Sequence, residues 1–447
     1  MSETEKAIDA LVIGAGPAGL AAAIRLDDLG LAVTMIEQRP TIGGAIYRQP
    51  IDGVAPVPQP AAAKARFAAL RKAVGARAIE RLHECLFLGV DGDGVALCEE
   101  RVSGRVLRFR PSIVIVATGA VEKVLPRPGW QLPGVSTAGG LQVMMKETGK
   151  APAGRIILAG NGPLLIAVAA QMTRLGNRPI AVIEAGTPFA RPLAGLKLMA
   201  FPGLLMESIG YMATLFIRLL SYRQGARLVA IRAENSGLVA TIRFRSGKFE
   251  EIAADRICLH DGIRPNDFGL PSEGVKPVIR HAGDCREALG AVAAEADGRR
   301  AADDAVAALS GPDSKGTSPV ARMRRAQTIL TEMFRAADPS PSLSGLPDET
   351  VICRCEGRTL SELKALMTGA DAPGGREVKH NGRFAMGACQ GRFCAHNTAA
   401  LMAEIRPTSP PVTAADLTGR RWPVRPVAIG AFLKQEPETS PDAIQDK

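Results

Sequence analysis

The chain has 447 residues, of which 46% are apolar, so it is long enough for two or three domains and too apolar to be disordered. Its formal charge of +10 arises from Lys and Arg residues scattered along the sequence, and aromatic residues make up only 4%. The chain therefore lacks the basic clusters with adjacent aromatic residues that are typical of nucleic-acid binding. We expect no nucleic-acid partner.

The N-terminal residues are polar and lead directly into an apolar strand, which is not the pattern of a secretory signal. Residues Leu196 to Leu220 are strongly apolar, but they include Lys197, Glu207 and Arg218, which argues against a membrane-spanning helix. We expect a cytoplasmic protein without a transmembrane segment. Peripheral contact with the inner face of the membrane stays open as an alternative.

Residues 8–37 have the pattern strand, glycine turn, helix, strand. The turn contains Gly14, Gly16, Pro17, Ala18 and Gly19 in a G-x-G-x-x-G motif. In such a motif the first glycine allows the tight turn, the second lets a pyrophosphate approach, and the third lets the helix pack on the strand. Glu37 ends the second strand 18 residues beyond Gly19, where a carboxylate can bind ribose hydroxyls. This unit predicts a dinucleotide site.

The pattern recurs over Arg155 to Glu184, with a second turn at Gly160 and Gly162. Leu165 stands where the third glycine would be, so the helix cannot approach its strand as closely. Glu184 ends the following strand and argues against a 2′-phosphate on the ribose. NAD(P) or another adenylate such as ATP is the expected ligand, and the alternative is a scaffold domain with a vestigial site.

The first unit resembles the two-dinucleotide-binding flavoproteins, the glutathione-reductase-like fold. The resemblance extends to three further short motifs, which are Gly43-Gly44, Thr118-Gly119 and Gly283-Asp284. It implies that these residues approach an FAD, with Asp284 near the ribityl and pyrophosphate groups. Because Asp284 also precedes a predicted helix, it can act as a helix cap as well.

Four cysteines lie close together near the C-terminus. They are Cys353 and Cys355, then after 33 residues Cys389 and Cys394. Two close pairs of thiolates can hold zinc or an iron–sulfur cluster, and the spacing alone does not choose between them. The surrounding residues resemble the bacterioferritin-associated-ferredoxin-like [2Fe–2S] module, which implies that the four cysteines are iron ligands.

The rest of the sequence assigns no acid, base or nucleophile, so the catalytic residues stay unknown. No C-x-x-C motif occurs, so disulfide exchange is not the expected chemistry. None of the five histidines forms a pair with metal-binding spacing.

Taken over nearly its whole length, the chain resembles the A (alpha) subunits of heteromeric opine, proline and hydroxyproline dehydrogenases and the similar large subunit of hydrogen cyanide synthase. The resemblance implies a separate flavin-containing beta subunit that oxidises an amine at its C–N bond. It also suggests two further components, an FMN at the partner interface and a small ferredoxin-like subunit. This chain would then carry electrons through FAD and a [2Fe–2S] cluster. The alternatives are a self-sufficient NAD(P)H-dependent flavin reductase with a [2Fe–2S] cluster, and a non-catalytic assembly subunit.

We therefore expect an α/β chain built from two Rossmann-type domains and a small C-terminal module. The expected limits are 1–125 and 255–310 for the FAD-type domain, 126–254 for the inserted nucleotide-binding domain, 311–347 for a linker with a helix, 348–405 for the [2Fe–2S] module, and 406–447 for a tail. The segment 311–347 is expected to consist of a linker at Gly311–Ser318, a helix over Ala321–Ala337 whose basic face lies in solvent, and a second linker at Pro339–Pro347. The tail is expected to be polar from Gln435 onward.

Overall fold

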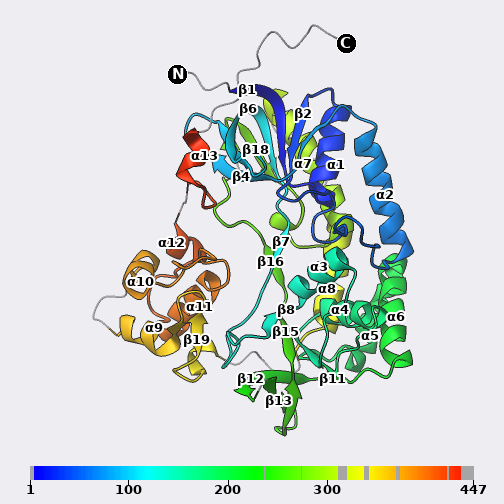
Figure 1. Ribbon diagram of the computed structural model, residues 1–447, viewed down its shortest axis with the longest axis vertical. Coiled ribbons are helices and arrows are strands. Elements are labelled where there is room, and N and C mark those ends of the chain that lie inside the picture. Colours follow the sequence, from blue (N-terminus) through cyan, green and yellow to red (C-terminus); the bar gives the residue numbers. More distant parts are fainter. Residues whose placement is uncertain are drawn as a thin grey trace.

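Figure 1 shows the computed structural model, which describes residues 5–235, 237–272, 274–310, 320–336, 342–368, 373–419 and 422–433. The linker expected at Gly311–Ser318 and the polar end expected from Gln435 lie outside the described residues. The first residues of the second expected linker, Pro339–Pro347, lie outside them as well.

The first domain is built on a sheet of eight strands in the order β17-β18-β6-β1-β2-β3, with β4 and β5 continuing from β6. Its strands are β1 (Lys6–Ile13), β2 (Val33–Ile36), β3 (Glu80–Leu82), β4 (Cys85–Val90), β5 (Ala96–Glu100), β6 (Arg105–Val116), β17 (Gly274–Val275) and β18 (Val278–His281). Its helices are α1 (Pro17–Asp28), α2 (Ala61–Gly75) and α7 (Ala291–Ser310). β1 runs parallel to both β2 and β6, as a Rossmann-type sheet requires.

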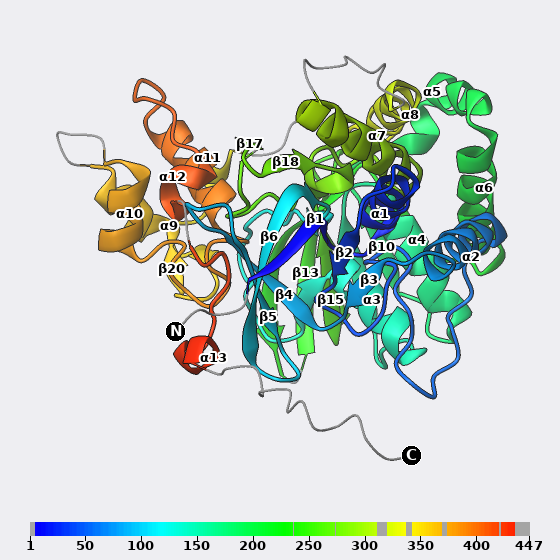
Figure 2. The ribbon, with the colours of Figure 1, turned by 90° about the horizontal axis from the view of Figure 1, so that it is seen from above.

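The continuous apolar sequence of β1 follows from its position in the middle of this sheet. Ala10 and Val12 face the core formed with α1 and α7, whereas Leu11 and Ile13 face the core formed with β4 and β5. All four side chains are at most 3% exposed. Figure 2 shows the two layers, with α1 and α7 on one side of the sheet and β4 and β5 on the other. A strand buried on both faces cannot alternate polar and apolar residues.

The second domain contains five parallel strands in the order β11-β10-β9-β15-β8 and a separate antiparallel sheet, β12-β13-β14. Its strands are β8 (Val135–Thr137), β9 (Ile156–Gly160), β10 (Ala181–Glu184), β11 (Tyr222–Gln224), β12 (Ala226–Glu234), β13 (Gly237–Phe244), β14 (Phe249–Ala254) and β15 (Arg256–His260). Its helices are α3 (Ala138–Thr148), α4 (Pro163–Arg174), α5 (Pro192–Lys197) and α6 (Pro202–Ile217).

The two domains are joined by an antiparallel ribbon of β7 (Ala120–Glu122) and β16 (Ile263–Pro265). The structure places β15 in the second sheet, where it pairs with β9 and β8. Residues 255–262 were assigned to the first domain from the sequence. That assignment was wrong because the sequence of an apolar strand does not indicate which sheet it joins. We therefore propose that the first domain resumes at β16.

The C-terminal module is a small helical unit with a core of its own. It contains β19 (Val351–Cys353), β20 (Arg358–Thr359), α9 (Leu360–Leu366), α10 (Gly375–Gly382), α11 (Ala395–Ile405) and α12 (Ala414–Thr418). Leu360, Val378, Phe384 and Leu401 are fully buried in this core. The chain then returns to the first domain, where the Val424 amide donates to the Leu88 carbonyl at 2.7 Å and α13 (Ile429–Leu433) follows.

α8 (Ala321–Met333) packs on the second domain and ends four residues before the expected end at Ala337. In the described part of the chain, no helix combines the length and the apolar character that crossing a membrane requires.

Candidate functional site

The first glycine turn has the geometry of a dinucleotide-binding loop. Gly14 has a φ of +98°, and a Cβ on Gly19 would lie 1.8 Å from the Gly14 carbonyl oxygen. A Cβ on Gly16 would meet only the Gly44 Cα, at 3.8 Å. Gly14 and Gly19 are therefore fixed by the fold itself, whereas Gly16 keeps an open side at the N-terminus of α1, where Pro17 is the first helical residue.

The other residues predicted for this site gather around the turn. Glu37 is 7% exposed and accepts hydrogen bonds from the Ala15 amide at 2.8 Å and the Arg39 amide at 3.0 Å. The Gly43 amide donates to the Ala15 carbonyl at 2.8 Å, and Gly44 lies against Gly16. The Thr118–Gly119 segment follows the end of β6, at the same edge of the sheet.

Gly283 reaches the turn from the end of β18. A Cβ on Gly283 would lie 2.6 Å from the Cβ of Ala18, so this position also requires glycine. The carboxylate of Asp284 accepts hydrogen bonds from the Leu289 amide at 3.0 Å and the Gly290 amide at 3.1 Å. Burial raises the pKa of Asp284, and the two amides oppose that change. Asp284 therefore holds the loop that precedes α7.

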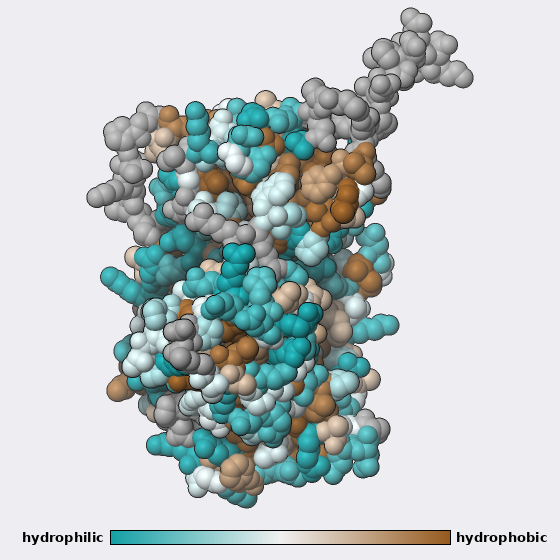
Figure 3. All heavy atoms as spheres, turned by 90° about the vertical axis from the view of Figure 1, so that its left-hand side faces the viewer, coloured by the Kyte–Doolittle hydropathy of each residue, from teal (hydrophilic) through white to brown (hydrophobic). Residues whose placement is uncertain are grey.

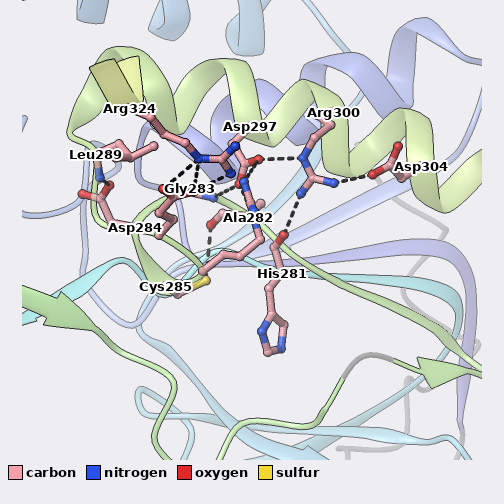
Figure 4. Close-up of polar contacts among 12 residues, drawn as sticks. His281, Ala282, Gly283, Asp284, Cys285, Leu289, Asp297, Arg300, Asp304 and Arg324 are labelled. Atoms are coloured by element: carbon pink, nitrogen blue, oxygen red, sulfur yellow. Dashed lines mark hydrogen bonds and ion pairs between the residues drawn. The ribbon is translucent and has the colours of Figure 1, made fainter. Parts of the chain in front are cut away.

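Asp297 of α7 anchors this loop and was not among the residues predicted from the sequence. Asp297 is 2% exposed and accepts hydrogen bonds from the Gly283 amide at 2.8 Å and from Arg286 and Arg300 (Figure 4). Burial acts to raise the pKa of Asp297, but the two guanidinium groups outweigh it and hold this pKa below its ordinary value. The sequence contains one sign of this role, because Asp297 is an acid among the alanines of the apolar face of α7.

At the second glycine turn the chain covers the end of the following strand, although a Cβ on Gly162 itself would meet only the His260 Nε2 atom, at 3.9 Å. Glu184 is 0% exposed and accepts hydrogen bonds from the Gly162 amide at 3.1 Å and the Gly186 amide at 2.9 Å. Ala336, just beyond α8, forms a β-bridge with Gly186, and a Cβ on Gly186 would lie 2.6 Å from the Phe334 carbonyl oxygen. The end of α8 therefore covers the strand end at which the ribose of a dinucleotide would bind.

Glu184 should also make stability depend on pH. Burial raises the pKa of this carboxyl to about 8, although two backbone amides oppose the shift. Between the ordinary pKa of a glutamic acid and about 8, the unfolded state loses this proton before the folded state does, so stability falls as pH rises. We expect Glu184→Gln to raise the melting temperature at pH 8 and to leave it nearly unchanged at pH 4, because Gln mimics the protonated acid. The effect at pH 8 should be a few kcal/mol, at about 1.4 kcal/mol per pKa unit.

Melting temperatures measured from pH 4 to 8 check this expectation. The exposed Glu349→Gln serves as the control and should keep the pH dependence of the unmodified chain. An equal pH dependence in Glu184→Gln would show that this carboxyl is ionised in the folded protein.

The four C-terminal cysteines come together as two pairs. The thiols of Cys353 and Cys394 hydrogen-bond to each other, and those of Cys355 and Cys389 do the same. Cys353 and Cys394 are each 1% exposed, whereas Cys355 is exposed. The Cys394 thiol donates to Cys353 and lowers the pKa of Cys353 to about 6. One pair is therefore buried and the other reaches the surface.

Backbone groups line these thiols. The amides of Ala385 and Glu356 donate to Cys353, and the Cys389 amide donates to Cys355. A Cβ on Gly387 would lie 2.3 Å from the Cβ of Cys355, so only glycine fits beside this thiol. Within the described ranges, no three His, Cys, Asp or Glu side chains are arranged to hold a single metal ion. Four thiols in two close pairs, with backbone amides beside them, are groups that can hold a metal centre.

A cavity of about 540 Å³ lies between α11 and the β7–β16 ribbon. Lys123, Arg264 and His396 line it together with Phe393, Asn397 and Glu404. The Arg264 guanidinium contacts the His396 ring and the Arg392 carbonyl oxygen. Within the described residues the Nε atoms of Arg264 and Arg392 have no hydrogen-bond partner. The cavity therefore offers cationic donors close to the buried cysteine pair.

Two nucleotide-binding domains, one inserted into the other, define an oxidoreductase of the two-dinucleotide-binding class. The family described as pyridine nucleotide-disulphide oxidoreductase matches residues 8–286. The chain belongs to this family, within the group that contains the A-type subunits of opine oxidases. The match ends before the cysteine module.

Relatives of similar length extend the likeness to the whole chain. The A-type subunit of opine oxidase from Agrobacterium tumefaciens (strain Ach5) is 32% identical, over 97% of this chain and 92% of its own length. Hydrogen cyanide synthase subunit HcnB of Pseudomonas protegens is 28% identical, over 97% of this chain and 99% of its own. The crystal structure of L-proline dehydrogenase from P. horikoshii has the same fold, with a TM-score of 0.62 at 18% identity over 97% of this chain and 81% of that chain.

Proposed function

We propose that this chain is the electron-transferring flavin and iron–sulfur subunit of a heteromeric amino-acid or opine dehydrogenase. The flavin of a partner beta subunit would take a hydride from the carbon next to nitrogen and leave an imine, which water hydrolyses or which cyclises. This chain would relay the electrons to an acceptor, such as a small ferredoxin-like subunit. The names of the relatives, which are subunits of opine oxidase and hydrogen cyanide synthase, support this assignment.

The observation that carries the proposal is the docking of the cysteine module onto the nucleotide-binding domains. The Trp130 indole, which is 0% exposed, donates to the Val351 carbonyl at 2.6 Å. The Asn397 side chain donates to the Val124 carbonyl at 3.0 Å, just beyond β7. The β7–β16 ribbon begins directly after Thr118–Gly119 and contacts the module through Arg264. One short ribbon thus connects the first dinucleotide site with the cysteines.

The residues fit the cofactors that this function requires. In the proposed holoprotein the first glycine turn, Glu37 and the Gly283–Asp284 loop hold FAD, and the four cysteines hold a [2Fe–2S] cluster. Flavin and cluster, when bound, supply one- and two-electron redox chemistry that the side chains lack. The cavity at Lys123, Arg264 and His396 is the place where the chain could bind the phosphate of an FMN shared with the partner.

The second turn is better suited to a structural adenylate, or to no ligand, than to a reacting nicotinamide. Leu165 is fully buried at the position of the third glycine, and the end of α8 lies against Gly186. Both features weigh against a self-sufficient NAD(P)H-dependent reductase.

An absorption spectrum with an iron and sulfide assay on anaerobically purified protein tests the proposal. We expect flavin bands, a broad iron–sulfur shoulder and about two irons per chain. Zinc in place of iron after reconstitution would contradict it. Bleaching of the flavin by NADH without a partner subunit would instead establish the reductase.

Arg354 should set the potential of the proposed cluster. Its guanidinium lies 5.2 Å from the centre of the Trp130 ring, and its charge interacts with Cys355 and Cys389. A fixed positive charge favours the more negative, reduced cluster, so Arg354→Gln should lower the midpoint potential. A spectroscopic redox titration measures it. The control is Arg299→Gln, which removes the same charge from an exposed side chain on α7 in the first domain. Equal potentials in the unmodified chain and both variants would exclude this role.

A further inference from the structure

Two buried cationic side chains lie where the second domain meets the first, and no contact described above accounts for them. Hydrophilic residues cover the middle of the face that carries the C-terminal module (Figure 3), where water and salt screen charged groups. In the described part of the chain, three Lys or Arg residues are buried, which are Arg48, Arg127 and Lys146, at 9%, 7% and 5% exposure. Arg127 is paired with Asp261. Arg48 and Lys146 therefore need a different explanation.

Lys146 reaches from α3 of the second domain to loop residues 43–47 of the first domain. Its ammonium group donates hydrogen bonds to the Ala45 carbonyl at 3.2 Å and to the Ile46 carbonyl at 2.9 Å, and Gln142 Oε1 lies at 3.5 Å. All of these oxygens are neutral, and among the described residues no carboxylate pairs with the ammonium group. Burial, and next the charge of Arg48, lower the pKa of Lys146 to about 8. The described chain therefore buries this positive charge without neutralising it.

Arg48 brings a second positive charge to the same place. Burial is the main cause that lowers the pKa of Arg48, and the charge of Arg39 adds to it. The Arg48 Nε atom lies 3.5 Å from Glu147 Oε1, and the same oxygen lies 4.0 Å from Arg39 Nη1. That Nε atom has no hydrogen-bond partner among the described residues. One carboxylate is therefore shared between two arginines, and a surplus of positive charge stays buried beside Lys146.

These cations adjoin the first glycine turn. The Gly43 amide donates to the Ala15 carbonyl at 2.8 Å, so the loop that Lys146 holds is also a wall of the turn. The charge of Glu37, the acid of that turn, acts on Arg48 as well. An uncompensated buried charge costs stability, and an apolar side chain would serve the packing better. Buried cations that persist beside a binding turn therefore indicate that a ligand supplies the missing negative charge.

We propose that Arg48 and Lys146 stabilise the negative charge that FAD at the first glycine turn acquires on reduction, a role that rests on the proposed function. Two electrons from the flavin of the beta subunit, taken up with one proton from solvent, convert the isoalloxazine ring to an anion, whereas uptake of a second proton leaves the ring neutral. Buried cations beside the flavin site favour the anion. Arg48 and Lys146 thereby raise the midpoint potential of the flavin and favour its acceptance of electrons from the partner.

A spectroscopic redox titration of the flavin-loaded full-length chain, repeated from pH 6 to pH 7.5, tests this role. In Lys146→Met the affinity for reduced relative to oxidised flavin should fall at least tenfold, which lowers the midpoint potential by about 30 mV or more. The potential should also change more steeply with pH, because the reduced ring then binds a second proton. Arg48→Gln should shift the potential in the same direction. The other charged groups nearby, which are Arg39, Glu37 and Glu147, are the same in every protein compared, so they do not account for a difference.

The matched control is Lys150→Met, which removes an exposed charge just beyond α3 and should keep the potential of the unmodified chain. Without flavin, Lys146→Met should melt at or above the temperature of the unmodified chain, because it removes an uncompensated buried charge. If Lys146→Met does not fold, Arg48→Gln carries the test.

Potentials equal to that of the control in both variants overturn the proposal. An equal loss of affinity for oxidised and reduced flavin does so as well, because it would show that the two cations only hold the loop. An unmodified chain that binds no flavin would instead overturn the proposed function, and this role of Arg48 and Lys146 with it.

Discussion

Replacing Cys355 by serine should reduce the iron content from about two per chain to nearly none, while the flavin content stays the same. A cysteine thiolate binds the iron of such a cluster far better than a serine hydroxyl does. Cys355 is the exposed member of its pair, so the change should leave the core of the module intact. Iron and sulfide assays, with electron paramagnetic resonance of the reduced protein, measure the loss.

The other cysteines provide the control for this experiment. Cys258 is buried in the second domain, where its thiol lies 3.2 Å from the Ser136 hydroxyl. Cys258→Ser should therefore keep both iron and flavin. Full iron in the Cys355→Ser protein would remove this residue from the ligand set and, with it, the proposed pairing of the four thiols.

The sequence predicts the first glycine turn well because its determinants are local. Gly14 and Gly19 lie against each other in the same short turn, and Glu37 accepts a hydrogen bond from Ala15 at the preceding strand–helix junction. Each requirement lies within a single βαβ unit of about 30 residues. Spacing alone is therefore sufficient to place these residues, and the structure brings them together.

The residues that hold the elements of this site together could not be predicted, because they connect distant parts of the chain. Gly298 of α7 packs so closely on α1 that a Cβ there would lie 2.1 Å from the Ala18 carbonyl oxygen. Asp297, its neighbour, binds the Gly283 amide. From the sequence alone, these two residues are recognisable only as part of a charged helix. The acid at position 297 among the alanines of α7 is the one local sign, and it does not identify the distant segment that it binds.

The second glycine turn also has contacts with a distant segment that the sequence could not predict. The glycines and Glu184 predict a nucleotide site, and the strand–helix–strand unit is present as expected. Phe334 and Ala336, which cover Gly186, belong to the segment expected to be a linker with a helix. The basic face of that helix was expected in solvent, but no local pattern identifies the partner of its end.

Adding one methyl group at Gly16 or at Gly19 should separate cofactor binding from folding. Gly16→Ala should fold normally, because its φ of −77° suits alanine and its Cβ would meet only the Gly44 Cα at 3.8 Å. The methyl would nevertheless stand where the pyrophosphate approaches the backbone, so FAD affinity should fall at least tenfold. Gly19→Ala should destabilise the first domain by about 1–3 kcal/mol or more, because its Cβ would lie 1.8 Å from the Gly14 carbonyl oxygen.

The two variants carry the same chemical change three residues apart, so each is the control for the other. Flavin titration and thermal unfolding of the flavin-free proteins measure the two effects separately. Loss of flavin with an unchanged melting temperature in Gly16→Ala would place the pyrophosphate at the N-terminus of α1. Normal flavin affinity in Gly16→Ala would mean that the cofactor binds elsewhere, and the route from this turn along β7 to the cysteines would then lose its starting point.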